Sequence, residues 1–229
     1  AWQLITMLRH VSLAAWLQVI TATVFTLVRV LLATALATLW VLPAGLIVGL
    51  NPRLSRVLQP IVQIVASFPA PMLFPLMVSL FVSAHIVLGW GSILLMMMSV
   101  QWYILFNVIA GAMTIPTDLR EVARSYGASW FQKFRSVYFP AVFPFLLTGW
   151  VTAAGGAWNA SIVTELVSFN GVELRTMGVG SLISQAAAQK QFPLLGASVL
   201  VMAVVVVGFN RTVWQRGYEL ASERFSLDK

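Results

Sequence analysis

Long apolar stretches without Asp, Glu, Lys or Arg dominate the chain. They occupy residues 30–52, 57–117, 136–164 and 191–210. A helix needs about 20 mostly apolar residues to cross the hydrocarbon core of a bilayer, and the second stretch is long enough for two crossings. The pattern therefore predicts five transmembrane helices, at about 26–50, 60–82, 86–110, 138–163 and 194–213.

The predicted fold class is an all-α, polytopic membrane protein in which residues 1–229 form a single transmembrane domain. Residues 1–23 are apolar but include Arg9 and His10, and no polar loop separates them from the first predicted span. We therefore expect an N-terminal helix that lies in the membrane interface and leads into that span. A sixth span is the alternative.

Glycine and proline modify this pattern. Gly45 and Gly49 form a small-xxx-small pair, which predicts close approach of two helices. The second span contains Pro69, Pro71 and Pro75, which indicate either packing within a bundle or a kinked helix along a pathway. Glycines also break the outer loop 168–193, where a short helix is expected at 181–191.

Composition agrees with a lipid-facing surface. Hydrophobic residues make up 59% of the chain and charged residues 9%, whereas soluble domains are about 25% charged. The absence of cysteine excludes a disulfide framework and a thiolate metal site. The net charge of +7 suits contact with anionic lipid headgroups. The basic residues are scattered rather than interleaved with aromatic residues, so nucleic acid is not an expected partner.

Lys and Arg are distributed unevenly between the two sides of the membrane. If the loop at 114–136 is cytoplasmic, the loop at 51–56 and the C-terminus lie on the same side. That side then carries Arg53, Arg56, Arg120, Arg124, Lys133, Arg135, Arg211, Arg216, Arg224 and Lys229. The other side keeps Arg9, Arg175 and Lys190. The positive-inside rule therefore predicts that this loop and the C-terminus are cytoplasmic.

One cytoplasmic segment, residues 114–140, is unusually charged for a membrane protein. Pro116, Thr117 and Asp118 are typical of a helix start, and Gly127 is a natural residue for its C-terminal cap. Apolar residues recur at helical spacing between these signals, at Leu119, Val122, Ala123 and Tyr126. The pattern predicts a helix–turn–helix along the membrane surface. Its second helix is expected at about 129–137, and Pro140 is expected to open the next span.

The same segment resembles the EAA loop of binding-protein-dependent ABC transporter permeases. That pattern is Glu-Ala-Ala, three residues, Gly, nine residues, an aliphatic residue, one residue, Leu and Pro. The chain matches its spacing without a gap through Glu121, Ala123, Gly127, Val137, Phe139 and Pro140. The departures, Val122, Val137 and Phe139, are all apolar. The resemblance extends from about residue 43 to the end of the chain and is greatest to the nitrate/sulfonate/taurine branch.

The resemblance implies a membrane-spanning importer subunit in a bacterial plasma (inner) membrane. The EAA loop, 114–137, would be the coupling helix that seats on an ATP-binding cassette subunit. The implied coupling residues are Arg120, Glu121, Ala123, Arg124, Gly127, Ala128 and Pro140. ATP and Mg would bind the partner, so no cofactor is expected in this chain. The other implied partners are an extracytoplasmic substrate-binding protein and a second permease copy or homologous half, within membrane lipid. An amphipathic helix held by the lipid surface is the alternative interpretation of the loop.

The fourth predicted span carries polar residues, which are costly at membrane depth and face a bundle interior or water. The candidate residues for a translocation pathway are Trp158, Asn159, Ser161 and Glu165. An interhelical hydrogen-bond network is the alternative. Glu165 is expected near the outer end of the span, where it could stay charged. No metal site is predicted.

Two other function classes compete with the importer. A channel or an ion-coupled secondary transporter would favour charged relays at mid-span or paired broken helices in repeated halves, and the sequence has neither. A membrane enzyme would favour motifs such as His-Glu-x-x-His or Gly-x-Ser-x-Gly, and these are absent. The substrate is predicted to be a small solute, and the branch resemblance favours an oxyanion such as nitrate, sulfonate or bicarbonate.

Overall fold

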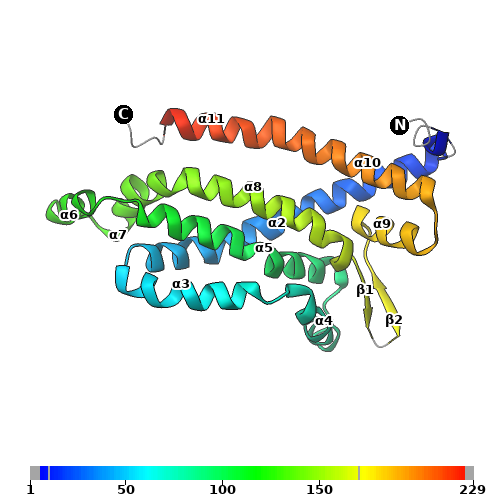
Figure 1. Cartoon of the computed structure of the whole chain (residues 1–229), viewed down its shortest axis with the longest axis horizontal. Coiled ribbons are helices and arrows are strands. Elements are labelled where there is room, and N and C mark those ends of the chain that lie inside the picture. Colours follow the sequence, from blue (N-terminus) through cyan, green and yellow to red (C-terminus); the bar gives the residue numbers. More distant parts are fainter. Residues whose placement is uncertain (1–5, 10, 170, 225–229) are drawn as a thin grey trace. The chain divides into compact units, whose positions relative to one another are not determined.

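The computed structural model describes residues 6–9, 11–169 and 171–224, and most of them are helical (Figure 1). Among these residues, four helical stretches are long and apolar enough to cross a membrane. They are Leu13–Gly49 (α2), Leu88–Met113 (α5), Trp130–Thr164 (α7, η2 and α8) and Phe192–Glu223 (mainly α10 and α11). A bent pair of shorter helices, Pro52–Ser67 (α3) and Ala70–Ser83 (η1 and α4), makes up to five. The helical fold class and the number of spans are thereby confirmed.

Helix α2 is longer than expected at its N-terminal end. It is one helix of 37 residues, so residues 13–23 form its first turns rather than a separate interfacial helix. The physical reason is that no proline or glycine interrupts the chain between Leu13 and Trp40. The expectation for residues 1–5 and 10 lies outside the described residues.

The chain folds into two compact units that share long helices. Unit 1 consists of Ala1–Leu36, Pro69–Val100 and Ala154–Phe209, and unit 2 of Ala37–Phe68, Gln101–Ala153 and Asn210–Lys229. Helices α2, α5 and α8 (Phe139–Thr164) each run through both units. The boundary therefore cuts across helices and not between them, and the single transmembrane domain stays a prediction.

The second predicted span is interrupted at its prolines. Helix α3 ends at Ser67, and the chain resumes as the 3-10 helix η1 (Ala70–Leu73) and helix α4 (Phe74–Ser83). Phe68 is extended, with φ −72° and ψ 127°, because the ring of Pro69 disfavours a helical conformation in the preceding residue. The expected helix at 60–82 is thus two helices with an extended link.

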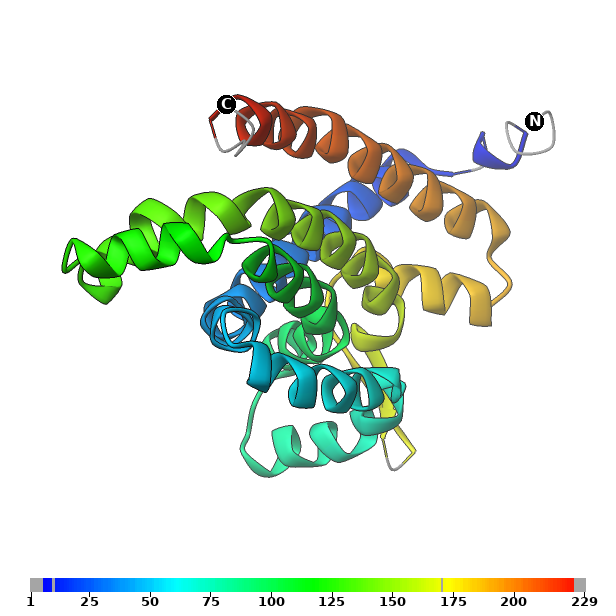
Figure 2. The ribbon, with the colours of Figure 1, turned by 60° about the vertical axis from the view of Figure 1, so that its left-hand side comes forward.

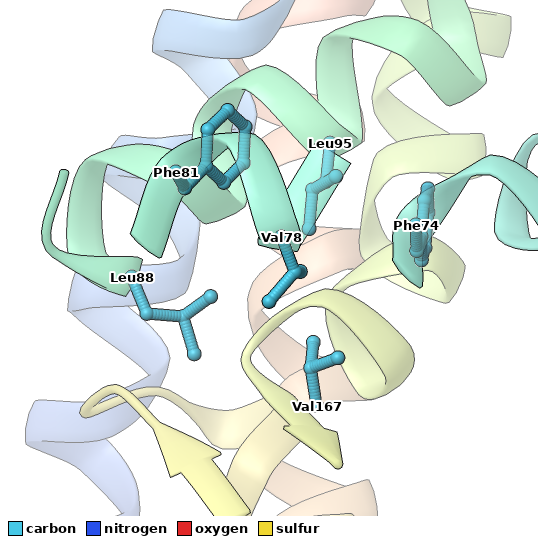
Figure 3. Packing of buried hydrophobic residues seen from close by; sticks show 6 residues of the cluster. All are labelled: Phe74, Val78, Phe81, Leu88, Leu95 and Val167. Atoms are coloured by element: carbon cyan, nitrogen blue, oxygen red, sulfur yellow. The ribbon is translucent and has the colours of Figure 1, made fainter. Parts of the chain in front are cut away.

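The core of unit 1 contains a cluster of buried side chains shown in Figure 3. Helix α4 contributes Phe74, Val78 and Phe81, which share one helix face. Leu88 and Leu95 come from α5 and Val167 from strand β1 (Leu166–Phe169). A second cluster joins Val19 and Ala22 of α2 to Leu182 of helix α9 (Val179–Ala188).

A short hairpin after α8 was not predicted. Strands β1 and β2 (Val172–Arg175) are antiparallel, with Leu166 opposite Arg175 and Phe169 opposite Val172. Gly171, in the turn, has φ +77°. Asn-Gly between residues rich in β-propensity is a strong hairpin signal, and it stands at 170–171. Helix α9 lies close to the short helix expected at 181–191.

Glycines allow close packing inside unit 2. A Cβ on Gly45 would lie 2.6 Å from Val108 Cγ1, and one on Gly49 would lie 2.5 Å from Ala112 Cβ. Both neighbours belong to α5, so the expected close approach of two helices at this glycine pair is confirmed.

Candidate functional site

The charged segment folds as a helical hairpin within unit 2. Helix α6 (Thr117–Ser125) follows Pro116, with Asp118 in its first turn and Arg124 in its last, as the helix dipole favours. Helix α7 (Trp130–Lys133) begins at a capping box, in which the Ser129 hydroxyl accepts from the Gln132 N–H and Gln132 Oε1 accepts from the Ser129 N–H. Both predicted helices are therefore present.

The turn between the helices is a Schellman motif centred on Gly127. The Ala128 N–H donates to the Ala123 carbonyl over 3.1 Å, and the Gly127 N–H donates to the Arg124 carbonyl over 3.0 Å. Gly127 has φ +63°, and a Cβ there would meet nothing within 4 Å. Backbone conformation rather than space therefore explains the glycine, and its predicted capping position is confirmed.

The second helix does not stop before Pro140. The π-helical segment η2 (Phe134–Tyr138) connects α7 to α8, and the Phe139 N–H donates to the Phe134 carbonyl. The helix is therefore continuous over Trp130–Thr164, as the ribbon in Figure 2 shows. Pro140 was expected to open a new helix because it has no N–H and its ring crowds the preceding turn. The wider π turn lies directly before Pro140 and keeps the helix intact.

Helix α6 has two chemically distinct faces. Leu119, Val122 and Tyr126 are spaced along one face and are 41%, 52% and 87% exposed. Trp130 and Phe131 of α7 are each 64% exposed. We refer to these five residues as the apolar face. Trp130 stacks on Phe134 with ring centroids 5.5 Å apart, but much of the apolar face stays exposed, which is unusual for large side chains that lie outside a predicted span.

The opposite face of α6 lines a pocket of about 330 Å³ in unit 2. Its lining residues are Leu50, Thr117, Arg120, Glu121, Arg124, Lys133 and Tyr138. Arg120 Nη1 donates to the Leu50 carbonyl over 2.8 Å, and Leu50 directly follows the last residue of α2. This bond attaches the surface helix to the end of a long span.

The predicted coupling residues are thus divided between these surroundings. Glu121, Arg124 and Gly127 are exposed, whereas Arg120, Ala123, Ala128 and Pro140 are half-buried. Arg120, Glu121 and Arg124 line the pocket, and Gly127 and Ala128 form the turn. Pro140 lies in α8, beyond the hairpin.

The candidate pathway residues lie in unit 1, and they separate into one exposed and three buried side chains. Asn159 is exposed, whereas Trp158, Ser161 and Glu165 are buried. The Ser161 hydroxyl donates to the Trp158 carbonyl over 2.7 Å. Glu165 follows the last residue of α8 and is 0% exposed. We expected the Glu165 carboxylate to be accessible to solvent, but it is buried.

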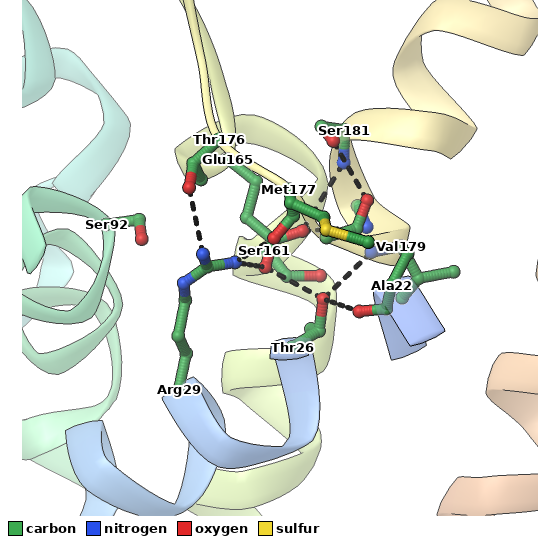
Figure 4. Close-up of polar contacts among 12 residues, drawn as sticks. Ala22, Thr26, Arg29, Ser92, Ser161, Glu165, Thr176, Met177, Val179 and Ser181 are labelled. Carbon is green, nitrogen blue, oxygen red and sulfur yellow. Dashed lines mark hydrogen bonds and ion pairs between the residues drawn. The ribbon is translucent and has the colours of Figure 1, made fainter. Parts of the chain in front are cut away.

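The Glu165 carboxylate is fully enclosed by donors (Figure 4). Its Oε1 accepts from the Thr26 hydroxyl over 2.8 Å and from Arg29 Nη1 over 2.9 Å. Its Oε2 accepts from the backbone N–H of Gly180 over 2.9 Å and of Ser181 over 3.4 Å. Those N–H groups open helix α9, so the carboxylate also caps a helix N-terminus.

Arg29 extends this network to the segment between strand β2 and helix α9. Its Nη1 also donates to the Met177 carbonyl over 2.6 Å, and its Nη2 donates to the Thr176 hydroxyl oxygen over 2.8 Å. The pair joins α2 to the end of α8 and to the segment before α9. The sequence did not pair these two residues, although an arginine this deep in an apolar helix requires a partner.

Two glycines make room for the network. A Cβ on Gly178 would collide with the Glu165 carboxylate, and one on Gly180 would collide with the Ser161 backbone. The glycines that were expected only to break the outer loop therefore permit close packing of α9 against the end of α8.

Residues 41–213 match the family described as binding-protein-dependent transport system inner membrane component. The chain belongs to this family. It is accordingly a multi-pass inner-membrane ABC transporter permease, and the resemblance seen in the sequence is confirmed. The family carries no cofactor of its own.

The permease is similar to several characterised transport proteins. It is 28% identical to the taurine transport system permease protein of Escherichia coli over 182 residues, 78% of this chain and 62% of that protein. It is 28% identical to a bicarbonate transport system permease protein of Synechococcus elongatus over 186 residues, 81% of this chain and 62% of that protein. It is 26% identical to a nitrate import permease protein of Leptolyngbya laminosa over 180 residues, 79% of this chain and 59% of that protein. The permease therefore spans about three-fifths of the length of these relatives.

The family match includes the helical hairpin and Glu165, but it begins after Thr26 and Arg29. The two side chains that satisfy Glu165 Oε1 thus come from outside the matched residues.

We expect replacement of Arg29 by Met to destabilise the purified permease by about 3–5 kcal/mol, because a buried carboxylate loses its cation. The double variant Arg29→Met/Glu165→Leu should lose less than the sum of the two single variants. Thermal unfolding in detergent measures the cycle, and additive losses would contradict the coupling.

Proposed function

We propose that this permease is the membrane-spanning subunit of an ATP-driven importer for a small anionic solute. The family description supports dependence on an external binding protein, and the sequence contains no phosphate-binding loop. ATP would therefore be hydrolysed on a separate ATP-binding cassette subunit. The distribution of Lys and Arg supports a cytoplasmic location for the helical hairpin and the C-terminus.

The apolar face is the observation that carries this proposal. Tyr126 is 87% exposed and Trp130 64%, on a helical hairpin that lies outside the predicted spans. Aromatic side chains of this kind dominate binding energy when a protein partner covers them. The ATP-binding subunit would bury this face, while Ala123 and Gly127 shape the turn beside it.

The attachments of α6 support its role in coupling. The Arg120–Leu50 hydrogen bond connects it to α2, and the continuous helix from Trp130 connects its hairpin to α8. A displacement of the hairpin by the partner would therefore move two long helices as rigid bodies. The importer would use ATP-driven closure of the partner in this way.

The pathway proposal centres on Asn159. Its exposed side chain lies four residues after Gly155, which is also exposed and has an open space beside it. These two residues of α8 would face the solute, with Trp158 and Ser161 packed behind them. The permease would need a second copy or a homologous subunit to enclose the pathway, since four or five spans form only one side of it.

The Arg29–Glu165 pair removes an argument against an anionic substrate. A free carboxylate at the outer end of a span would repel an anion, but Glu165 is fully buried and paired at 2.9 Å. Its charge is therefore compensated within unit 1. The relatives that transport taurine, bicarbonate and nitrate make sulfonates and oxyanions the proposed substrate class.

One prediction of this proposal concerns assembly. Val122→Glu should lower co-purification of the ATP-binding subunit by about thirty-fold, since a charge on a buried contact costs about 2 kcal/mol or more. Ser125→Glu is the matched control, because Ser125 is exposed on the same helix but outside the apolar face. Equal assembly of both variants would contradict docking through the apolar face.

The second prediction concerns coupling through Gly127. Gly127→Val should abolish binding-protein-stimulated ATP hydrolysis in the reconstituted complex, because a β-branched residue is strained at φ +63°. Gly127→Asn should retain most of the stimulation, since Asn tolerates the left-handed conformation. Both variants should still insert in the membrane. Normal stimulation with Val at this position would count against the turn as a coupling element.

The third prediction concerns substrate. Vesicles containing the complete complex should accumulate labelled taurine, nitrate or bicarbonate only when ATP and the binding protein are present. Asn159→Leu should reduce that uptake while leaving basal ATP hydrolysis intact. Uptake that continues without the ATP-binding subunit would indicate a channel or an ion-coupled transporter instead.

A further inference from the structure

The pocket beside α6 holds a concentration of positive charge, of which the proposed coupling mechanism uses only the Arg120–Leu50 bond. Arg120, Arg124 and Lys133 line its 330 Å³, and Glu121 is the single acidic residue among the lining. Within the described residues, ion pairing is confined to Arg29 and Glu165, so none of the three cations is paired. Arg120, which also lines a neighbouring pocket, has in addition a buried Nε without a hydrogen-bond partner. An anion in the pocket would give the unpaired cations a partner.

The pocket faces away from the proposed protein contact. Thr117, Arg120, Glu121 and Arg124 share one side of α6, whereas Leu119, Val122 and Tyr126 share the opposite side. A protein that covers the apolar face would contact one side of α6 and leave the pocket on the other side open to a second ligand.

The pocket also lies at the end of one long helix and beside another. Leu50 follows the last residue of α2, and Tyr138 is the last residue of the π segment η2 within the continuous helix Trp130–Thr164. This is the level of the lipid headgroups in a membrane-spanning protein, and tyrosine is enriched there. Basic pockets between spans on the cytoplasmic side are typical sites for phosphate-bearing headgroups.

We propose that this pocket binds a phosphate group, supplied by an anionic phospholipid of the inner leaflet. The cations of Arg124 and Lys133 neutralise it, and the hydroxyl of Tyr138 offers a further donor. A bound headgroup connects α6 to the start of α8, beside the Arg120–Leu50 bond. The inference rests on the proposed cytoplasmic placement of the hairpin, but it requires no ATP-binding subunit.

The test measures lipid retention by the purified permease. Nanodiscs of phosphatidylcholine with a small fraction of phosphatidylglycerol would be compared with phosphatidylcholine alone, with native mass spectrometry as the readout. Lys133→Gln should weaken retention of phosphatidylglycerol by about five-fold, the value of one cation near an anionic surface. Arg135→Gln is the matched control, because Arg135 is exposed two residues away and does not line the pocket. Arg124→Gln provides a second pocket variant.

Several outcomes decide the proposal. Loss in both pocket variants but not in Arg135→Gln supports the site. A parallel arm would use nanodiscs of phosphatidylcholine alone with millimolar inorganic phosphate. Phosphate binding that depends on Lys133 in the same way would support the phosphate site and make free phosphate its source. Equal loss in all three variants would show non-specific surface attraction and overturn the site. Unchanged lipid retention together with failed assembly of the ATP-binding subunit would assign the pocket to a protein carboxylate, and the phosphate proposal would be wrong. If lipid binding depends on Lys133 but the unmodified protein does not bind an ATP-binding subunit, the lipid site would be supported and the importer function would be contradicted.

Discussion

The hydrogen-bonded carboxylate of Glu165 is the interaction on which the organisation of unit 1 depends. An ionised group with no exposure to water is tolerated only when donors surround it, and here they come from α2 and the start of α9. Because two of the donors lie on α2 and two at the start of α9, satisfying one carboxylate fixes the positions of both segments at the end of α8. Gly178 and Gly180 follow from the same constraint, since any side chain at either position would displace an oxygen or the backbone behind it.

Much of the fold could be predicted because a helix that crosses a bilayer must be apolar over about 20 residues. Charge-free runs located the long helices, and Gly45 and Gly49 indicated where two of them meet. The errors lie where local chemistry competes with that pattern. The chain around Pro69 is apolar enough to span, but a proline controls the conformation of Phe68 and breaks the helix. The β-hairpin was not predicted, because the Asn-Gly signal at 170–171 lies in an outer loop whose glycines were expected only to break the segment.

The local backbone structure of the candidate site could be predicted from the sequence, but its tertiary contacts could not. Pro116 and Gly127 mark the ends of α6 through backbone conformation alone, which a sequence expresses directly. Residues distant in the sequence decide which face of α6 is covered. The hydrogen bond from the Arg120 side chain to the Leu50 carbonyl therefore had no local signal in the sequence. The pairing of Arg29 with Glu165 is of the same kind. Each residue was conspicuous by itself, but the contact joins positions 136 apart in the chain.

The π turn before Pro140 explains how a proline can stand between a surface helix and a span without separating them. A proline in a regular α-helix removes one hydrogen bond and crowds the carbonyl four residues earlier. In this chain the Phe139 N–H reaches Phe134 instead, so the wider turn accommodates the ring and the axis continues into α8. A break here would let the hairpin pivot without moving α8. Because the helix is continuous from Trp130 to Thr164, the exposed aromatic residues of α7 stand at the start of the same helix that forms the fourth predicted span.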